Sequence, residues 1–241
     1  MKNAIFFLLP CIMTLAGCMP KTFYQIYKTA YSQTMFQKDN TLVYEDDNCT
    51  VTYNLWSEYG NAGFAFFNKS EENIYVNLGE SFFIRNGMAY DYYQSRTFSE
   101  SQSVTFQERK TICIPPNAAK IVYEYNIQEA LFKDCDLPKS PTKKQIITKT
   151  YSEQNTPIVF GNIISYTVGQ TEKNIVIKND FYVSQITNYP ESEAATLGEF
   201  LKLNHEDAAP YKFYIRYTYT IEYQPHRLQP LDSDGWPERK K

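Results

Sequence analysis

The sequence is poor in histidine and glycine, which limits its catalytic chemistry. Among 241 residues there are 2 histidines, His205 and His226, and 9 glycines. A serine or cysteine hydrolase needs a histidine beside its nucleophile and an acid that orients it. No G-x-S-x-G elbow occurs, and Ser81 in GESFF lacks that spacing. We therefore interpret both histidines as solvated loop residues and expect the chain not to be an enzyme.

Patterns for metals, phosphates and cofactors are missing too. No C-x-x-C occurs, and Ala209 stands where an H-E-x-x-H motif would need its second histidine. Residues 232–235 (DSDG) resemble the front of a calcium loop but lack its later ligands. Residues 45–47 (EDD) fit a cation seat or a solvated turn, and we favour the turn. Because no phosphate-cradling glycine motif is present either, we expect no metal and no cofactor.

A large excess of charge of either sign is also absent. There are 24 basic and 27 acidic residues, and 43% of the residues are hydrophobic. Such a chain can bury a core, which excludes a disordered tail. Basic residues cluster only at 143–144 and 239–241, which is too few to follow a nucleic-acid backbone. We expect no nucleic-acid partner.

The sequence does contain an apolar N-terminal run. Residues 4–17 (AIFFLLPCIMTLAG) follow Lys2 and carry no charge. As a helix they would reach about 21 Å, short of the ~30 Å hydrocarbon layer of a bilayer, and Pro10 interrupts them. This run therefore predicts a targeting segment rather than a permanent membrane span.

The run ends in Leu15, Ala16, Gly17 and Cys18, which resemble the lipobox of bacterial lipoproteins. The resemblance covers residues 1–18. It implies cleavage before Cys18, attachment of a diacylglycerol to its sulfur and acylation of the freed amine. Two or three acyl chains hold a protein firmly to a membrane. The alternative is an ordinary signal peptide cut elsewhere, with Cys18 an incidental thiol.

The residues after the cysteine bear on the membrane face. Met19 follows Cys18 where an aspartate retains lipoproteins at the inner membrane, and no acidic residue precedes Asp39. The resemblance therefore implies an outer-membrane lipoprotein that faces the periplasm, with the cell surface as the alternative. The expected parts are a signal peptide (1–17), a lipidated tether (18–22), a folded body (23–230) and a C-terminal tail (231–241).

Three cysteines remain in the exported body, where the compartment is oxidising. Ile112 and Ile114 flank Cys113 in an apolar run, so we predict that Cys113 is a buried small hydrophobe. Cys49 and Cys135 lie at polar margins, and we predict a structural disulfide between them. The two other pairings and no bridge at all remain open.

Alternation of apolar and polar residues with period two dominates the body. It is clearest in residues 211–223 and recurs in residues 51–55, 74–78, 121–125 and 164–168. Asparagine, glycine and proline stand between these segments, which is typical of half-buried strands joined by turns. We predict an all-β fold in which two antiparallel sheets pack face to face as a β-sandwich.

One short helix is expected. In residues 191–203 (ESEAATLGEFLKL), Ala194, Leu197 and Leu201 fall on one helical stripe. Residues 23–31 fit a helix and a strand almost equally well, and we favour a strand because FYQIYKT is aromatic and alternating.

A polar stretch with two prolines, residues 133–145, is typical of a linker. Residues 70–76 and 171–177 resemble each other, which suits a duplicated hairpin or a duplicated domain. We predict a single elaborated sandwich over residues 23–230, with a subdivision at 133–145 as the alternative.

The sandwich is expected to be immunoglobulin-like in architecture only. Trp56 follows Cys49 by an odd number of residues, and Thr111 stands where a tyrosine should precede Cys113, so the strict signature fails. Residues 53–93 and 162–190 are similar to a group of uncharacterised bacterial lipoproteins. That resemblance covers most of the chain and implies no known activity.

Aromatic residues offer one further lead. Tyr90, Tyr92 and Tyr93 in MAYDYYQ fit an exposed platform for stacking sugars or docking a partner, because tyrosine combines a flat apolar body with a hydroxyl. Ordinary sandwich packing explains them as well, since tyrosine favours strands generally.

Together these patterns predict a membrane-anchored envelope lipoprotein that acts as a non-enzymatic protein-interaction or structural module. Its expected partners are the membrane, through Cys18, and another envelope protein. A glycan-binding module that uses exposed tyrosines is the first alternative. An envelope hydrolase is the second and weaker alternative.

Overall fold

The structure is a computed structural model that describes residues 20–95, 97–101, 104–122, 125–171, 173–197, 200–203 and 208–220. The described residues form an all-β fold of two large antiparallel sheets without any helix of 7 or more residues. None of their helices has the length and apolar character that crossing a bilayer requires. Cys18, His205 and His226 lie outside the described residues.

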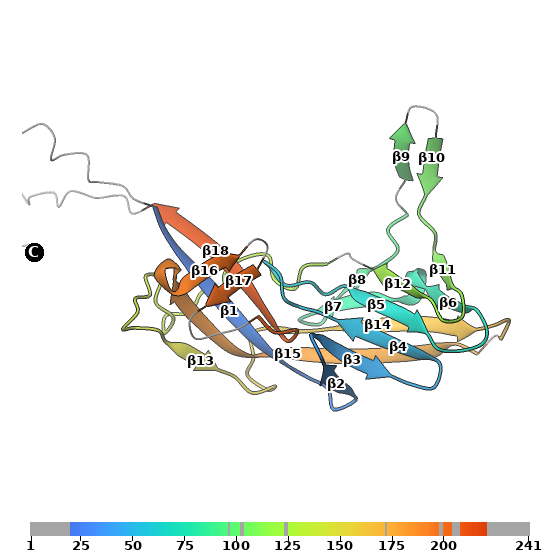
Figure 1. The fold of residues 1–241 in the computed structure, drawn as a ribbon, viewed down its shortest axis with the longest axis horizontal. Helices are drawn as coiled ribbons and strands as arrows, with labels where there is room; N and C mark the ends of the chain where they lie inside the picture. The colour runs from blue at the N-terminus through green and yellow to red at the C-terminus, as the bar shows by residue number, and fades with distance from the viewer. Residues whose placement is uncertain are drawn as a thin grey trace, which may run out of the picture. The chain divides into compact units, whose positions relative to one another are not determined.

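The larger sheet has nine strands, and one of the two sheets is curled into a half-barrel. The hydrogen-bonded order of the larger sheet is β11-β6-β14-β15-β1-β18, with β13 beside β15, and β7 joining β14 to β8. Figure 1 shows β14 and β15 side by side as its long central strands. The bounds are β1 Pro20–Tyr31, β6 Ile74–Asn77, β7 Phe82–Arg85, β8 Met88–Asp91, β11 Thr111–Ile114, β13 Thr148–Thr150, β14 Val159–Val168, β15 Ile175–Pro190 and β18 Lys212–Thr220.

The smaller sheet has five strands in the order β12-β5-β4-β3-β2. Alternation sets its two faces: in β4, Cys49, Val51 and Tyr53 point into the core while the residues between them are half-exposed. The bounds are β2 Met35–Lys38, β3 Thr41–Glu45, β4 Cys49–Tyr53, β5 Phe64–Asn68 and β12 Ala119–Val122.

The inner faces of the two sheets pack against each other through aromatic side chains. Phe66 on β5 meets Tyr166 on β14 edge to face, with ring centroids 5.4 Å apart. Tyr53 on β4 meets Phe181 on β15 in the same way, also at 5.4 Å. All four side chains are 2% exposed or less. Burying side chains of this size contributes about 1.5–3 kcal/mol each, so these contacts hold the two sheets together.

The predicted helix over residues 191–203 is wrong. Glu191–Glu193 form one short 3-10 turn (η2), and a second, η1, spans Leu78–Glu80. Beyond η2, β16 (Ala194–Leu197) pairs antiparallel with β17 (Phe200–Leu203). Residues 198 and 199, which separate the two strands in the sequence, lie outside the described residues. A second two-stranded ribbon joins β9 (Thr97–Ser101) and β10 (Val104–Gln107).

The other predicted strands agree with the structure in whole or in part. Residues 23–31 belong to β1, and residues 212–220 of the predicted strand 211–223 form β18. Residues 51–53, 74–77, 121–122 and 164–168 lie in β4, β6, β12 and β14. The chain divides into two compact units, Phe23–Tyr217 and a smaller one made of Met1–Thr22 with Thr218–Lys241. Residues 133–145 lie within the larger unit. In the smaller unit, the hydroxyls of Thr22 and Thr218 share a hydrogen bond of 2.9 Å.

Candidate functional site

A cavity of about 560 Å³ lies within the larger unit. One wall is residues 130–139, which we name the strap, and the opposite wall comes from β1, β15 and β18. Its volume falls within the range of small-molecule sites. The lining is mainly apolar and comprises Phe23, Gln25, Ala130, Leu131, Phe132, Lys133, Asp134, Cys135, Leu137, Lys139, Asn188 and Tyr217.

Two buried amides hold the strap in place. Gln25 donates through Nε2 to the Phe132 carbonyl oxygen at 3.0 Å and accepts at Oε1 from the Phe132 backbone N–H at 2.8 Å. Asn188 donates through Nδ2 to the Pro138 carbonyl oxygen at 3.0 Å. The two amides are also joined, because Gln25 Nε2 donates to Asn188 Oδ1 at 3.0 Å. Since Gln25 and Asn188 are 1% and 2% exposed, these bonds fix the strap against the sheet.

Tyr27 on β1 also belongs to this hydrogen-bond network. Its hydroxyl donates to Gln25 Oε1 and accepts from the Phe132 backbone N–H at 3.1 Å. Burial raises the pKa of the Tyr27 phenol well above its usual value. The group therefore stays protonated and keeps its role as a donor to Gln25.

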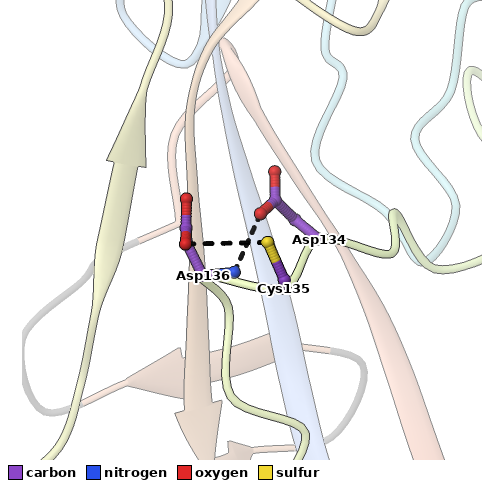
Figure 2. Close-up of side chains that lie close together, drawn as sticks. All are labelled: Asp134, Cys135 and Asp136. Atoms are coloured by element: carbon purple, nitrogen blue, oxygen red, sulfur yellow. Dashed lines mark hydrogen bonds between the residues drawn. The ribbon is translucent and has the colours of Figure 1, made fainter.

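An acidic cluster stands in the strap. Figure 2 shows Asp134, Cys135 and Asp136 close together, and their ligand atoms lie within 4.8 Å of one another. The Lys149 ammonium on β13 lies 2.5 Å from Asp134 Oδ2 and 3.0 Å from Asp136 Oδ2. The hydrogen bond from Lys149 lowers the pKa of Asp134 below its usual value. Lys149 thus already supplies the positive charge that a bound cation would bring.

The predicted tyrosine platform does not form as one exposed surface. Tyr92 is only 1% exposed, and its hydroxyl donates to Asn162 Oδ1 at 2.5 Å in the core. Tyr90 and Tyr93 are half-buried. The rings of Tyr90 and Tyr92 both contact Tyr125, at interplanar angles of 49° and 67°. These rings form a tilted cluster that serves packing, so the prediction is wrong for Tyr92.

The predicted disulfide is also not formed, because Cys49, Cys113 and Cys135 are all free. Cys49 points into the core from β4, whereas Cys135 is exposed on the strap. Burial is the main cause that raises the pKa of the Cys49 thiol, and the nearby Asp46 carboxylate adds to it. Cys49 is therefore a packed, unreactive thiol.

Other residues considered for chemistry have structural roles. The Ser81 hydroxyl donates to the Asn77 carbonyl oxygen at 2.7 Å and accepts from the Ser165 backbone N–H at 3.0 Å. In the turn at residues 45–47, Asp46 accepts from the Cys49 backbone N–H at 2.7 Å and from the Tyr166 hydroxyl at 2.9 Å. Both groups are thus engaged in holding turns and strands together.

The outward side of the smaller sheet carries a continuous uncharged row. Strand register places Phe36, Val43, Thr52, Ala65 and Ile121 directly opposite one another across all five strands. Directly opposite residues of antiparallel strands share a face. At the two ends of the row, Phe36 is 44% exposed and Ile121 is 56% exposed, whereas Val43 between them is only 3% exposed, so the row is open to a partner mainly at its ends.

A second row extends this surface. Phe67 on β5 lies opposite Thr50 and Ala119, and it is 37% exposed. The row continues to Glu45 on β3, which lies opposite Thr50 and forms an ion pair with Lys69. A hollow of about 290 Å³ opens beside Thr52 and Ile121. We name the uncharged residues of the two rows the outer face; it comprises Phe36, Val43, Thr50, Thr52, Ala65, Phe67, Ala119 and Ile121.

Neither the cavity under the strap nor the outer face was predicted from the sequence. Residues 133–145 were interpreted as a linker, although Leu131, Phe132 and Leu137 were an available signal that the strap packs on the body. Gln25 could not be found, because a single glutamine in an aromatic strand has no distinguishing pattern. The outer face was detectable in principle, since Ala65 and Phe67 occupy strand positions that are polar in most half-exposed sheets.

Comparison of the chain with protein-family models, with curated proteins and with solved structures finds no match.

Proposed function

We propose that this chain is a membrane-anchored envelope lipoprotein that acts as a non-enzymatic module and binds another envelope protein through its outer face. The anchor rests on the resemblance of Leu15, Ala16, Gly17 and Cys18 to a lipobox. The binding rests on the outer face, which is the single observation that carries this part of the proposal. Outer-membrane attachment facing the periplasm goes with the same resemblance.

The composition of the outer face supports a protein partner. A half-exposed antiparallel sheet normally turns polar side chains outward, yet the row from Phe36 to Ile121 contains no charged residue. Interface cores are depleted in charge and rich in aromatic and aliphatic side chains. Glu45, which ends the second row opposite Thr50, is a carboxylate and gives no attraction for a polyanion. The occupant that fits is a protein with a flat, uncharged apolar patch of its own.

The proposal extends to the architecture of the body. Two antiparallel sheets share one aromatic core through Phe66 and Tyr166, which supports an immunoglobulin-like sandwich. The glycan-binding alternative loses its basis, because Tyr92 is in the core and only Tyr90 and Tyr93 remain partly exposed.

The test compares two strand residues of matched exposure in the full-length, anchored chain. Ile121 is 56% exposed on the outer face, and Val176 is 59% exposed on β15. A photo-reactive residue at position 121 should cross-link to one defined envelope protein in intact cells, and the same group at position 176 should not.

The captured protein is then purified and titrated against three forms of the full-length chain. Ile121→Glu should weaken binding at least tenfold, about 1.4 kcal/mol, because it places a charge in an apolar interface. Val176→Glu should bind like the unchanged chain. Equal binding by all three forms, or cross-links that are the same at both positions, would contradict the proposal.

A further inference from the structure

The cavity beneath the strap shares no residue with the outer face. We propose that it is a binding site for an amphipathic anion with a single acyl chain. The chain would lie against the apolar walls, and the anionic head would meet two lysines of the strap.

The walls suit a hydrocarbon chain. Side chains from both sides of the cavity, Phe23 on β1 and Leu131, Phe132 and Leu137 on the strap, are apolar. The volume of about 560 Å³ is that of a small-molecule site. Binding of a hydrocarbon chain in such a cavity is favourable, because the apolar surfaces of the chain and of the walls are removed from water.

The polar groups within the cavity are already engaged. Both Nε2 hydrogens of Gln25 have acceptors, on Phe132 and Asn188, and its Oε1 accepts from the Phe132 backbone N–H and the Tyr27 hydroxyl. Asn188 bonds to the Pro138 carbonyl oxygen. Gln25 therefore has no hydrogen-bonding capacity left for a sugar or a peptide, and the cavity favours an apolar chain over a polar ligand.

The strap brings positive charge to the cavity. Lys133 and Lys139 line it and are exposed. Within the described residues neither of them forms an ion pair, whereas the one carboxylate in the lining, Asp134, is paired with Lys149. The two lysines are therefore free to meet a carboxylate or a phosphate head, which completes the complementarity to an amphipathic anion.

Cys135 is a native thiol that reports on the site, so no reporter residue has to be introduced. It is exposed and lines the cavity, while Cys113 is half-buried on β11 and absent from the lining. In the full-length chain in nanodiscs, dodecanoate should slow maleimide labelling of Cys135 at least fivefold and leave the rate at Cys113 unchanged. Dodecanol and acetate should each protect less than twofold. A twelve-carbon lysophosphatidylglycerol arm separates a lipid source from a free fatty acid.

Two sets of variants define the site. Ala130→Trp fills the cavity from an exposed position, and Lys133→Gln with Lys139→Gln removes the charge. Each should reduce protection by dodecanoate to less than twofold. The matched control, Lys38→Gln with Lys120→Gln, changes two exposed lysines of the smaller sheet and should keep the full protection.

Three outcomes would overturn the proposal. The first is that neither dodecanoate nor the lysolipid protects Cys135. The second is that dodecanol protects Cys135 as well as dodecanoate does. The third is that protection by dodecanoate survives both Ala130→Trp and the double lysine change. Binding at the outer face can fail or succeed without affecting any of these measurements.

Discussion

Asn179 on β15 donates a hydrogen bond of 2.7 Å from Nδ2 to the hydroxyl of Tyr53 on β4. The two residues are 0% and 1% exposed, and the bond joins the larger sheet to the smaller one. Burial raises the pKa of the Tyr53 phenol far above its usual value, so this hydroxyl stays neutral in the core. A polar contact inside the aromatic core therefore helps to fix the position of one sheet against the other.

Tyr53→Phe should lower the free energy of unfolding by about 1–3 kcal/mol, because it leaves the Asn179 amide buried without this partner. Urea denaturation of the full-length chain measures the change. Tyr182→Phe on β15 is the matched control, since Tyr182 is only half-buried, and it should change stability by less than about 0.5 kcal/mol. Equal losses for the two variants would contradict a role for the Tyr53–Asn179 bond.

Gln25→Ala should release the strap. The substitution removes two bonds to the Phe132 backbone, one to Asn188 and one from the Tyr27 hydroxyl, at a cost of about 1–3 kcal/mol. Trypsin should then cut more rapidly after Lys133 and Lys139. Gln37→Ala is the control, because Gln37 is exposed and bonds only to the Asp39 carbonyl oxygen among the described residues. Unchanged cleavage in Gln25→Ala would show that the amide does not hold the strap.

Acid should loosen the strap as well. The hydrogen bond from Lys149 lowers the pKa of Asp134 in the folded chain, so this pair stabilises the fold above the unfolded aspartate pKa of about 3.9. The stabilisation is lost as the pH falls through the lower, folded value. NMR titration of the strap amides should show a transition below about pH 4 that Asp134→Asn abolishes. A transition that persists in Asp134→Asn would assign it to another group.

Cys135→Ser should leave the stability of the fold within about 0.5 kcal/mol of the unchanged chain, because Cys49, Cys113 and Cys135 are free. A bridge from Cys49 to Cys135 would instead make the substitution cost about 2–5 kcal/mol. Urea denaturation without a reducing agent distinguishes the two. In the folded chain Cys49 should also resist thiol reagents, since it is 0% exposed.

Strand alternation was enough to predict the all-β fold, and β1 and β18 show why. Both have long aromatic runs with a consistent period of two, and in a strand this period places the aromatic side chains on one face of the sheet. The helix predicted for residues 191–203 was wrong because Ala194, Leu197 and Leu201 satisfy a helical stripe, whereas β16 and β17 pair as antiparallel strands. Spacing within a short apolar segment cannot separate these outcomes.

The sites were harder to predict because they depend on contacts between distant segments. Cys49 has polar neighbours in the sequence, but it shares the buried period of Val51 and Tyr53, and that signal could have placed it in the core. Tyr92 follows the end of β8 and keeps the period of Tyr90, with the exposed Asp91 between them, so the alternation could have placed both tyrosines on one face but not shown that this face packs in the core. The strap owes its place to Gln25, which is far away in the chain.

Membrane anchoring of this protein is tested most sharply by its lipid attachment at Cys18. Cells expressing the full-length chain are fed labelled palmitate and fractionated. The unchanged chain should carry the label and sediment with membranes, Cys18→Ser should lose both properties, and Cys135→Ser should keep both. Label and sedimentation that are unaffected by Cys18→Ser would contradict the anchored module on which the proposed function depends.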